Sequence, residues 1–520
     1  MIQSGKEARE SLLNGINVLA NIVRTTLGPK GSTVVLHTPE GKAYTTKDGV
    51  SVARKVFDND MMIDAGVQLV REATAKTAEV AGDGTTTSTI LAQALINHCI
   101  TQMNSGASAL SLKKGMESAL ADTVKLLKEK YSTPVGFDRK SLTDVATVSA
   151  NNDSQIGELV AEAFMQAGED GLVLFDMSPN EHTFTESISG MQIDSQLISP
   201  AFITNQRLQT AEYEAKDHNV AILLIDDIVK NVQEMAQHVL NHTVSQQIPL
   251  ILIAHDFSNG VLKEIIQNNV RNNAQVLPLK ADGYGVGKTE CLRDIAALTG
   301  ATIFDNTSTA RYEGLGACKK IIVSKFKTVI VKADNVDAST LESRIEALKS
   351  RIEEEKEKFN KKQLKEKLAK LVGKMSIIHV GGITEAVAKE KFDRVEDAVC
   401  ATRAAIEEGI SLGGGVTYMK IYEELIEGKD TAFPNVVGYT ILLDALKAPF
   451  NQLCANCGDL SLIFADAPEG CDGYNFLTDE WCNMKEAGII DPTKVLRVAL
   501  ENAVSIASLI ITTSGIITTE

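Results

Sequence analysis

The chain has 520 residues, of which 44% are hydrophobic and 23% are charged, so it is a folded protein with more chain than one compact core needs. We expect two to four folding units. The 68 acidic residues outnumber the 52 basic ones and give a formal net charge of −16, which disfavours binding to nucleic acid or anionic lipid through a net field. One Trp and 5% aromatic residues also exclude a lectin or a sandwich of short aromatic strands.

The sequence predicts neither a membrane span nor a targeting signal. The longest uncharged apolar stretch near either end covers residues 503–511 and contains two Ser residues, so it is too short to cross a bilayer. The first 13 residues include Lys6, Glu7, Arg9 and Glu10, and they lack both the apolar segment of a secretory signal and the acid-poor character of a transit peptide. Eight Cys without a dense framework indicate reduced thiols in a cytoplasm-like compartment.

The N-terminal third is predicted to be helical with one hairpin. Apolar residues spaced four, three and four apart predict a first helix that ends at Gly28-Pro29. A strand at 33–36, a polar turn and a second strand ending in Lys47-Asp48-Gly49 then form a hairpin. The residues on the buried face of the first helix are predicted to be Leu12, Ile16, Leu19 and Val23.

Two further helices, at 61–80 and 85–100, are separated by a glycine-rich turn, and the segment 82–87 reads Gly-Asp-Gly-Thr-Thr-Thr. Two glycines let a ligand approach the backbone, and the free N–H groups of the next helix with three hydroxyls could hold a phosphate. Asp83 then stands where a phosphate-bridging Mg²⁺ needs a carboxylate. A well-capped helix explains the same residues, so both interpretations stay open on the motif alone.

The middle third is predicted to be α/β. Apolar runs at 220–225, 250–254 and 327–331 read as strands between helical stretches, which is typical of this class. Residues 338–371 are rich in Glu and Lys and predict a charged helix or helical hairpin. A last strand at 375–380 leads back to helices, so we expect one domain to be inserted within another.

A glycine loop at 285–289 (Gly-Val-Gly-Lys-Thr) resembles a Walker loop only in part. The first Gly of that motif would stand five residues before Gly287, where this chain has Asp282. We therefore interpret the segment as a loop before a helix near 291–298, and a small-molecule kinase built on Lys288 is a disfavoured alternative.

Other candidate sites are weaker still. Cys454 and Cys457 form a CxxC pair, but the next two Cys stand eleven residues apart, so buried structural thiols explain them better than zinc. The eight His show no metal-ligand spacing. Asp393, Glu396 and Asp397 lie near two Arg residues and fit a solvated helix face on spacing alone.

Six motifs together resemble the signatures of the group I chaperonins, the GroEL type. They occur in the family's order and at nearly its spacing over essentially the whole chain. The motifs are TTLGPKG at 25–31, TKDGVSVA at 46–53, AGDGTTT at 81–87, RVEDA at 394–398, GGG at 413–415 and GIIDPTKV at 488–495.

The resemblance implies a subunit of mixed α and α/β class with three domains. A mainly helical equatorial ATPase domain would comprise residues 1–131 and 408–520, and a small intermediate domain 132–188 and 375–407. An inserted α/β apical domain, 189–374, would bind substrate. The resemblance also implies a homo-oligomeric ring of about seven subunits around a cavity for non-native polypeptides, driven by ATP binding and hydrolysis.

The resemblance assigns ATP, Mg²⁺ and K⁺ to one site. Asp397 would orient or activate the attacking water, with Asp48 beside it, and Asp83 would bind Mg²⁺. The phosphate contacts would be Gly84, Thr85, Thr86 and Thr87, with Leu27, Gly28 and Pro29 close by. Backbone carbonyls of Thr26 and Lys47 would bind K⁺, and Gly414, Asn475, Ile489 and Asp491 would enclose the adenosine.

For substrate, the resemblance implies an exposed apolar surface on the apical segments, which would bind any chain with an uncovered core. Some of these side chains must face the apical core on geometric grounds. The candidate residues are Leu197, Phe202, Val239, Leu262, Ile265 and Ile266.

Several departures from the family leave alternatives open. Asn451 and Leu460 replace a charged inter-ring pair that double-ring relatives commonly have, so a single ring and a double ring are both possible. Ser195 stands where the family has an Arg that pairs with the retained Glu385, which puts ring cooperativity in doubt. A less aromatic rim leaves the need for a co-chaperonin lid undecided. The alternative function is a ring-forming paralogue that holds or binds partners rather than folding them.

Overall fold

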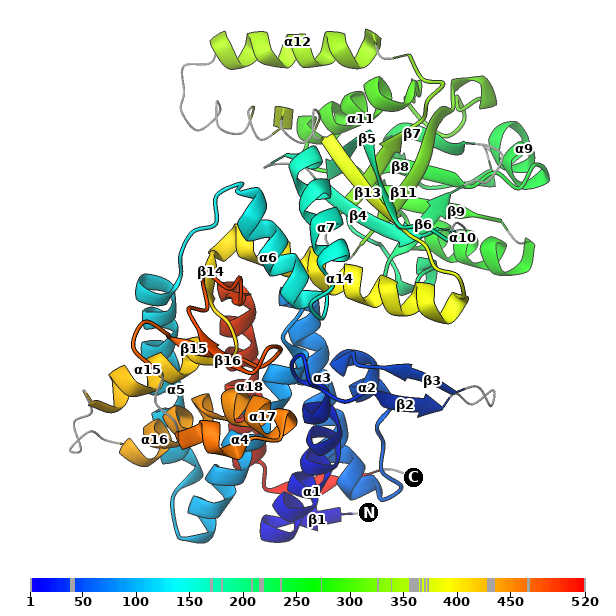
Figure 1. Cartoon of the computed structure of the whole chain (residues 1–520). Coiled ribbons are helices and arrows are strands. Elements are labelled where there is room, and N and C mark those ends of the chain that lie inside the picture. Colours follow the sequence, from blue (N-terminus) through cyan, green and yellow to red (C-terminus); the bar gives the residue numbers. More distant parts are fainter. Residues whose placement is uncertain are drawn as a thin grey trace. The chain divides into compact units, whose positions relative to one another are not determined.

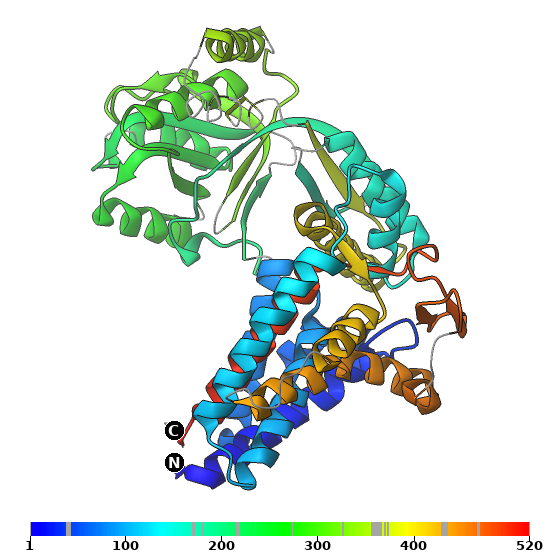
Figure 2. The ribbon, with the colours of Figure 1, turned by 90° about the vertical axis from the view of Figure 1, so that its left-hand side faces the viewer.

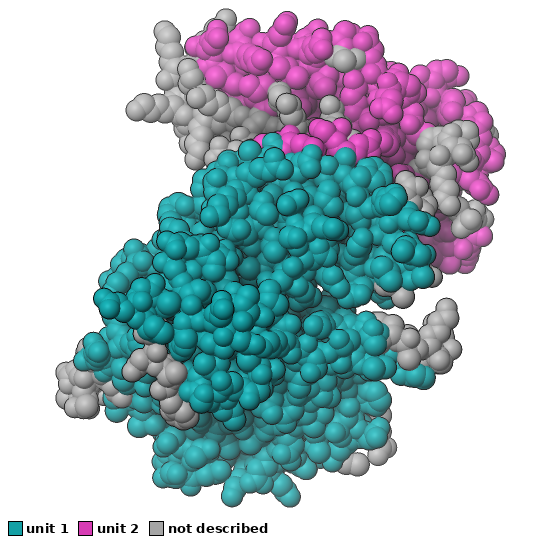
Figure 3. All heavy atoms as spheres, in the orientation of Figure 1, with its two compact units in different colours: residues 1–165, 175–185, 378–520 teal, residues 166–174, 186–377 magenta. Residues whose placement is uncertain are grey.

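The chain forms two compact units in this computed structural model (Figure 3). Unit 1 comprises residues 1–165, 175–185 and 378–520, and unit 2 comprises 166–174 and 186–377, so unit 2 is inserted within unit 1 as the sequence predicts. The split of unit 1 into equatorial and intermediate domains stays a prediction. The structure describes residues 2–518 except 38–42, 169–171, 179–180, 207–208, 215–218, 234–235, 273, 325–326, 338, 355–363, 365–366, 369–370, 372–373, 428–434 and 465–467.

Long helices form the core of unit 1 (Figure 1). The residues predicted for the buried face of the first helix are all in this core. The two ends of the chain meet, because β1 (Ile2–Ser4) pairs antiparallel with β18 (Gly515–Ile517). Figure 2 shows α5 and α18 running side by side. The core helices are α1 (Gly5–Val23), α3 (Met61–Ala81), α4 (Thr85–Asn104), α5 (Ala109–Leu126), α16 (Val436–Leu446) and α18 (Thr493–Thr512).

One helix in the described part of the chain, α18, is long and apolar enough to span a membrane. Of its most apolar 18-residue window, 72% is buried inside the protein, as expected for a core helix. Uncharged stretches alone predict no span here, because the helix contains Lys494, Arg497 and Glu501. Arg497 forms ion pairs with Glu408 and Glu501, so its charge is balanced by carboxylates within unit 1.

Smaller elements complete unit 1. A hairpin, β2 (Val34–His37) and β3 (Ala43–Thr46), leads into the short helix α2 (Gly49–Lys55). Two further two-stranded sheets pair β14 (Ile410–Leu412) with β17 (Ile490–Pro492) and β15 (Gly473–Asn475) with β16 (Glu480–Cys482). The remaining helices are α6 (Arg139–Ser149), α7 (Ser154–Ala167), α14 (Glu385–Glu408), α15 (Val416–Glu427) and α17 (Ala448–Cys457).

Unit 2 is an α/β fold, as predicted. Its centre is a parallel set of strands in the order β7-β8-β9, most of whose residues are buried. The full strand order is β4-β13-β5-β12-β11-β7-β8-β9, with β10 on β7 and β6 on β11. The strands are β4 (Leu172–Met177), β5 (Phe184–Ile193), β6 (Ala211–Glu214), β7 (Val220–Val229), β8 (Leu250–Phe257), β9 (Val276–Lys280), β10 (Ile303–Phe304), β11 (Gly316–Val323), β12 (Thr328–Lys332) and β13 (Lys374–Val380).

The predicted strands at 220–225, 250–254, 327–331 and 375–380 correspond to β7, β8, β12 and β13. The charged segment 338–371 does begin with a helix, α12, and its later part lies largely outside the described residues. Arg344 of α12 forms ion pairs with Glu290 and with buried Asp294, so its charged face is partly anchored rather than fully solvated. The helices of unit 2 are α9 (Asn241–Ser245), α10 (Asn259–Asn272), α11 (Val286–Thr299) and α12 (Ser339–Glu354).

Candidate functional site

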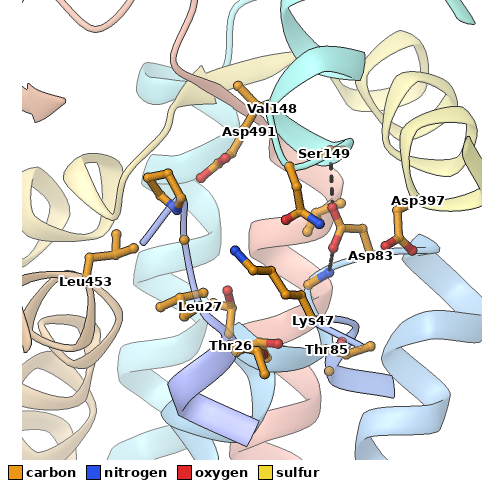
Figure 4. A pocket seen from close by; sticks show the side chains of 18 of the residues that line it. Thr26, Leu27, Lys47, Asp83, Thr85, Val148, Ser149, Asp397, Leu453 and Asp491 are labelled. Carbon is orange, nitrogen blue, oxygen red and sulfur yellow. Dashed lines mark hydrogen bonds between the residues drawn. The ribbon is translucent and has the colours of Figure 1, made fainter. Parts of the chain in front are cut away.

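A cavity of about 260 Å³ in unit 1 gathers every residue to which the sequence analysis assigned a nucleotide, metal or catalytic role (Figure 4). The residues come from segments that lie hundreds of positions apart in the chain. They are Thr26, Leu27, Gly28, Pro29, Lys47, Asp48, Asp83, Gly84, Thr85, Thr86, Thr87, Asp397, Gly414, Asn475, Ile489 and Asp491.

The turn between α3 and α4 forms one wall of the cavity. Gly82 and Gly84 have φ angles of 76° and 83°, a left-handed conformation that favours glycine. Space also requires glycine here, because a Cβ on Gly84 would lie 2.6 Å from Val495 Cγ1. α4 begins directly after this turn, so the free N–H groups of its first turn lie at the cavity, where they could bind an anion.

A second helix start lies beside the first. Asp48 caps α2 by accepting hydrogen bonds from the backbone N–H groups of Val50 (2.9 Å) and Ser51 (2.8 Å). A Cβ on Gly49 would lie only 2.3 Å from Thr86 Oγ1, so the first turns of α2 and α4 are in close contact. The sequence analysis placed Lys47-Asp48-Gly49 at the end of a strand and missed α2, although Asp is a common N-cap residue.

The loop that contains Gly28 is held by a side chain from α17. Asn456 donates hydrogen bonds from Nδ2 to the backbone carbonyls of Arg24 (3.0 Å) and Leu27 (2.9 Å). Gly28 has a φ of 79° and lies against Leu453, where an added Cβ would come within 2.3 Å of Leu453 Cδ2. This loop is therefore fixed against α17 at the edge of the cavity.

Three of the carboxylates that line this cavity have raised pKa values. The lining carboxylates among the described residues are Asp48, Asp83, Glu390, Asp393, Asp397 and Asp491. Burial, followed by the charges of Asp48 and Asp83, raises the pKa of Asp397 well above its usual value. Burial raises the pKa of Asp83 as well, against hydrogen bonds from the backbone N–H of Gly84 and from Ser149 Oγ at 3.3 Å (Figure 4). Burial and the charge of Asp83 raise the pKa of Asp491 to about 7.

This concentration of carboxylates suits a bound cation. A cation would stabilise the ionised forms that burial and repulsion disfavour. The described residues contain no group of three or more His, Cys, Asp or Glu side chains arranged to hold a metal by themselves. That is compatible with Mg²⁺, which usually binds through one or two carboxylates and completes its shell with phosphate oxygens and water.

Replacing Asp491 by Asn tests the raised pKa. Because the folded-state pKa of about 7 exceeds the reference value of 3.8, ionisation destabilises the ligand-free fold increasingly as the pH rises through this window. We expect the stability advantage of Asp491→Asn over wild type to grow by about 1–3 kcal/mol between pH 5 and pH 8. Denaturant unfolding of both proteins at the two pH values measures this, and a pH-independent difference would contradict the assignment.

The far end of the cavity is built by paired strands and aromatic rings. Pairing of β14 with β17 places Ser411 opposite Asp491, and the backbone N–H of Gly413 donates to the carbonyl of Ile489 at 2.9 Å. Next to them, Tyr474 and Phe476 line the cavity with ring centroids 5.3 Å apart. These rings make their part of the lining apolar, as a nucleoside requires.

Several lining residues were not identified from the sequence. Asn151 and Asn152, between α6 and α7, have φ angles of 58° and 63°, which Asn adopts more readily than most residues. The Asn-Asn pair just after α6 was an available signal for this turn. Ser149 and Arg394 also line the cavity. Arg394 opens the RVEDA motif at 394–398, whereas nothing in the local sequence of Ser149 distinguishes it from a surface residue.

The Walker-like segment does not form a phosphate loop. Lys288 Nζ donates to the backbone carbonyl of His255 at 2.7 Å, and Thr289 Oγ1 donates to Asp226 Oδ1 at 2.8 Å. Both side chains are therefore engaged within unit 2. All eight cysteines are free thiols. Cys454 is fully buried, as predicted, but Cys457, Cys471 and Cys482 are only partly buried, so the prediction of buried thiols holds for one residue of the pair.

The apolar substrate surface needs a correction. Phe202, Val239 and Ile265 are buried in the core of unit 2, with 3%, 0% and 4% of their surface exposed. The expectation that they are exposed is wrong, because each side chain points from its segment into the apolar core. Leu197, Leu262 and Ile266 are half-buried and pack at the edge of that core, so a role in substrate binding stays a prediction for these three.

Comparison with known proteins adds two findings. The model of the TCP-1/cpn60 chaperonin family matches residues 19–520. Two crystal forms of the chaperonin gp146 from the bacteriophage EL 2 (Pseudomonas aeruginosa), in the presence of ATP-BeFx, resemble this chain with TM-scores of 0.70 (form II) and 0.64 (form I). Each is 22% identical and covers 100% of this chain and 99% of its own, a likeness that establishes the fold.

Proposed function

Because this chain belongs to the TCP-1/cpn60 chaperonin family, we propose that it is an ATP-dependent molecular chaperone that captures non-native polypeptides and promotes their folding. In this proposal the subunits assemble into a homo-oligomeric ring of about seven around a central cavity. The protein acts in a cytoplasm-like compartment, and a co-chaperonin lid is a candidate partner. ATP binding and hydrolysis drive the cycle.

The observation that supports this proposal most directly is the single cavity of unit 1. Two helix N-termini, glycines without room for a side chain, six carboxylates and an apolar end meet there among the described residues. Phosphoryl transfer needs mainly positioning and charge neutralisation, and these groups provide both. The structures of gp146 were determined in the presence of ATP-BeFx, an observation that concerns gp146 and not this chain.

We assign the phosphates to the first turn of α4, with Thr85, Thr86 and Thr87 as hydroxyl contacts. Asp83 would hold Mg²⁺, and the carbonyls of Thr26 and Lys47 would hold K⁺. Bound there, the cations would neutralise phosphate charge. The chain itself contributes the fixed N–H dipoles, the shape of the turn and the orientation of Asp83 by Ser149.

Asp397 is the group that we assign to the attacking water. It lies on α14, and its raised pKa makes its carboxylate a stronger proton acceptor than an exposed Asp. The charges of Asp48 and Asp83 contribute to that pKa. Activity therefore depends on α14 and α4 being held in register, which couples hydrolysis to any movement of α14.

A test of the polypeptide-binding surface uses the half-buried residues of α10. We expect Leu262→Ser with Ile266→Ser to weaken capture of a denatured polypeptide by about three- to tenfold, because less apolar surface remains to be covered. Fluorescence anisotropy of a labelled unfolded protein measures the affinity. Gln267→Ser, an exposed position on the same helix, serves as the control, and equal losses in both variants would contradict the assignment.

The proposed function itself is tested by refolding. A chemically denatured enzyme is diluted into the purified protein with ATP, Mg²⁺ and K⁺, and both phosphate release and recovered enzyme activity are followed. We expect ATP turnover, lost when EDTA removes Mg²⁺, together with a higher yield of active enzyme. Turnover with polypeptide held but never refolded would favour the holding paralogue, and the absence of any turnover would contradict the proposal.

A further inference from the structure

Three separate walls enclose the apolar end of the nucleotide pocket. The first is the loop with Leu27, Gly28 and Pro29, the second is α17 with Pro449 and Leu453, and the third is the turn after β15 with Asn475, Phe476 and Leu477. All three meet in a small apolar cluster that includes Leu453, Tyr474 and Phe476. A ligand bound at this end would therefore contact all three walls.

One polar contact joins the three walls at their outer edge. Lys30, which follows the first wall, forms an ion pair with Asp479 of the third. Cys457, the last residue of α17, lies between them, with its Sγ 3.6 Å from Lys30 Nζ and 3.3 Å from Asp479 Oδ1. Lys30 and Asp479 are 449 residues apart in the sequence, so the contact links segments that chain connectivity leaves independent.

The turn that carries Asp479 is itself rigidly built. The backbone N–H of Asp479 donates to the carbonyl of Asn475 at 2.9 Å, and Asn475 Oδ1 accepts from the N–H of Leu477 at 2.9 Å. Asp479 has a φ of 61°, which Asp tolerates better than most residues. Because of these hydrogen bonds, a displacement of the Asp479 carboxylate would also move Asn475 and Leu477, both of which line the pocket.

The contact also lies next to a lining ring. Burial, followed by the charge of Asp479, raises the pKa of Tyr474, a residue that lines the pocket. Tyr474 in turn packs edge-on against Trp481 with ring centroids 5.4 Å apart. The ion pair therefore sits on the exposed edge of the same aromatic cluster that forms the apolar end.

We propose that Lys30, Asp479 and Cys457 form a clasp on the rim of the pocket that holds its three walls together and slows nucleotide release. The clasp residues are positioning residues, since they act through Leu27, Asn475 and α17 rather than on the phosphates. This inference rests on the proposed nucleotide binding. It predicts an effect on the dissociation rate constant and none on the chemistry at Asp397.

The test measures dissociation of mant-ADP, displaced by excess ATP in a stopped-flow instrument. Because both side chains are partly solvated, we expect Lys30→Met and Asp479→Asn each to speed dissociation by about two- to fivefold. High KCl should speed dissociation more in wild type than in either variant, because salt screens the ion pair only where it exists. The charge-reversed double variant, Lys30→Asp with Asp479→Lys, should return the rate toward wild type.

Controls distinguish failure of the clasp from failure of nucleotide binding. Glu424→Gln removes an ion pair of similar exposure with Lys130, away from the pocket, and should leave the rate unchanged. Wild-type dissociation rates in Lys30→Met and Asp479→Asn would overturn the clasp while leaving nucleotide binding intact. Failure of the wild-type protein to bind mant-ADP at all would overturn the proposed function.

Discussion

Replacing Asp397 by Ala is expected to slow ATP hydrolysis by about 10²–10⁴-fold while leaving nucleotide affinity nearly unchanged. Burial, followed by the charges of Asp48 and Asp83, raises the pKa of Asp397 well above its usual value, so its loss removes a proton acceptor and also relieves repulsion with those two carboxylates. The affinity for ATP should therefore be equal to or slightly higher than that of wild type. Single-turnover hydrolysis and equilibrium binding measured on the same preparation distinguish the two effects.

Two further variants serve as comparisons for that result. Asp397→Asn keeps the size of the side chain and should be as slow as the Ala variant, because an amide cannot accept the proton. Glu407→Ala removes a carboxylate from the same helix that pairs with Lys494 outside the pocket, and it should hydrolyse ATP normally. Normal turnover in Asp397→Ala would remove the catalytic assignment.

Replacing Asp83 by Asn is expected to lower the rate of Mg²⁺-dependent hydrolysis by about 10²–10³-fold. The variant keeps an acceptor for the Gly84 N–H and for Ser149, so the turn should hold its shape, but it loses the negative charge that would bind the metal. A rise in the Mg²⁺ concentration needed for half-maximal rate is therefore expected together with the loss. Titration of Mg²⁺ at fixed ATP measures both quantities.

Glu79→Gln provides the matched control for Asp83→Asn. Glu79 lies on α3, four residues before Asp83, at an exposed position outside the pocket. Its replacement should change neither the rate nor the Mg²⁺ requirement. If Asp83→Asn keeps a wild-type Mg²⁺ dependence, another group binds the metal and the assignment of Asp83 is wrong.

The local pieces of the site were readable from the sequence because each depends on short-range chemistry. The Gly-Asp-Gly turn before α4 was predicted from its glycines, and both adopt the left-handed backbone that only glycine favours. The buried face of α1 followed from helical spacing. The chaperonin fold, inferred from the order of six motifs, is confirmed by the family match and by full-length structural similarity.

What spacing could not predict depends on tertiary contacts. No local pattern places Asp397 of α14 close enough to Asp48 and Asp83 for their charges to shift its pKa. No local pattern identifies Tyr474 and Phe476 either, since their place at the pocket comes from packing against residues of α17.

The same reason explains the errors in unit 2. Val239 and Ile265 lie on helical segments with apolar residues on more than one face, and only the packed sheet decides which face is covered.

The central claim is that chemistry in the pocket of unit 1 changes how the protein holds an unfolded chain, and one measurement tests it most directly. A fluorescently labelled, denatured polypeptide is bound to the purified protein, and its anisotropy is followed after addition of ATP with Mg²⁺. The account predicts a fall in anisotropy with wild type as polypeptide is released, accompanied by phosphate production. An anisotropy that stays constant while ATP is hydrolysed, or the absence of hydrolysis, would contradict it.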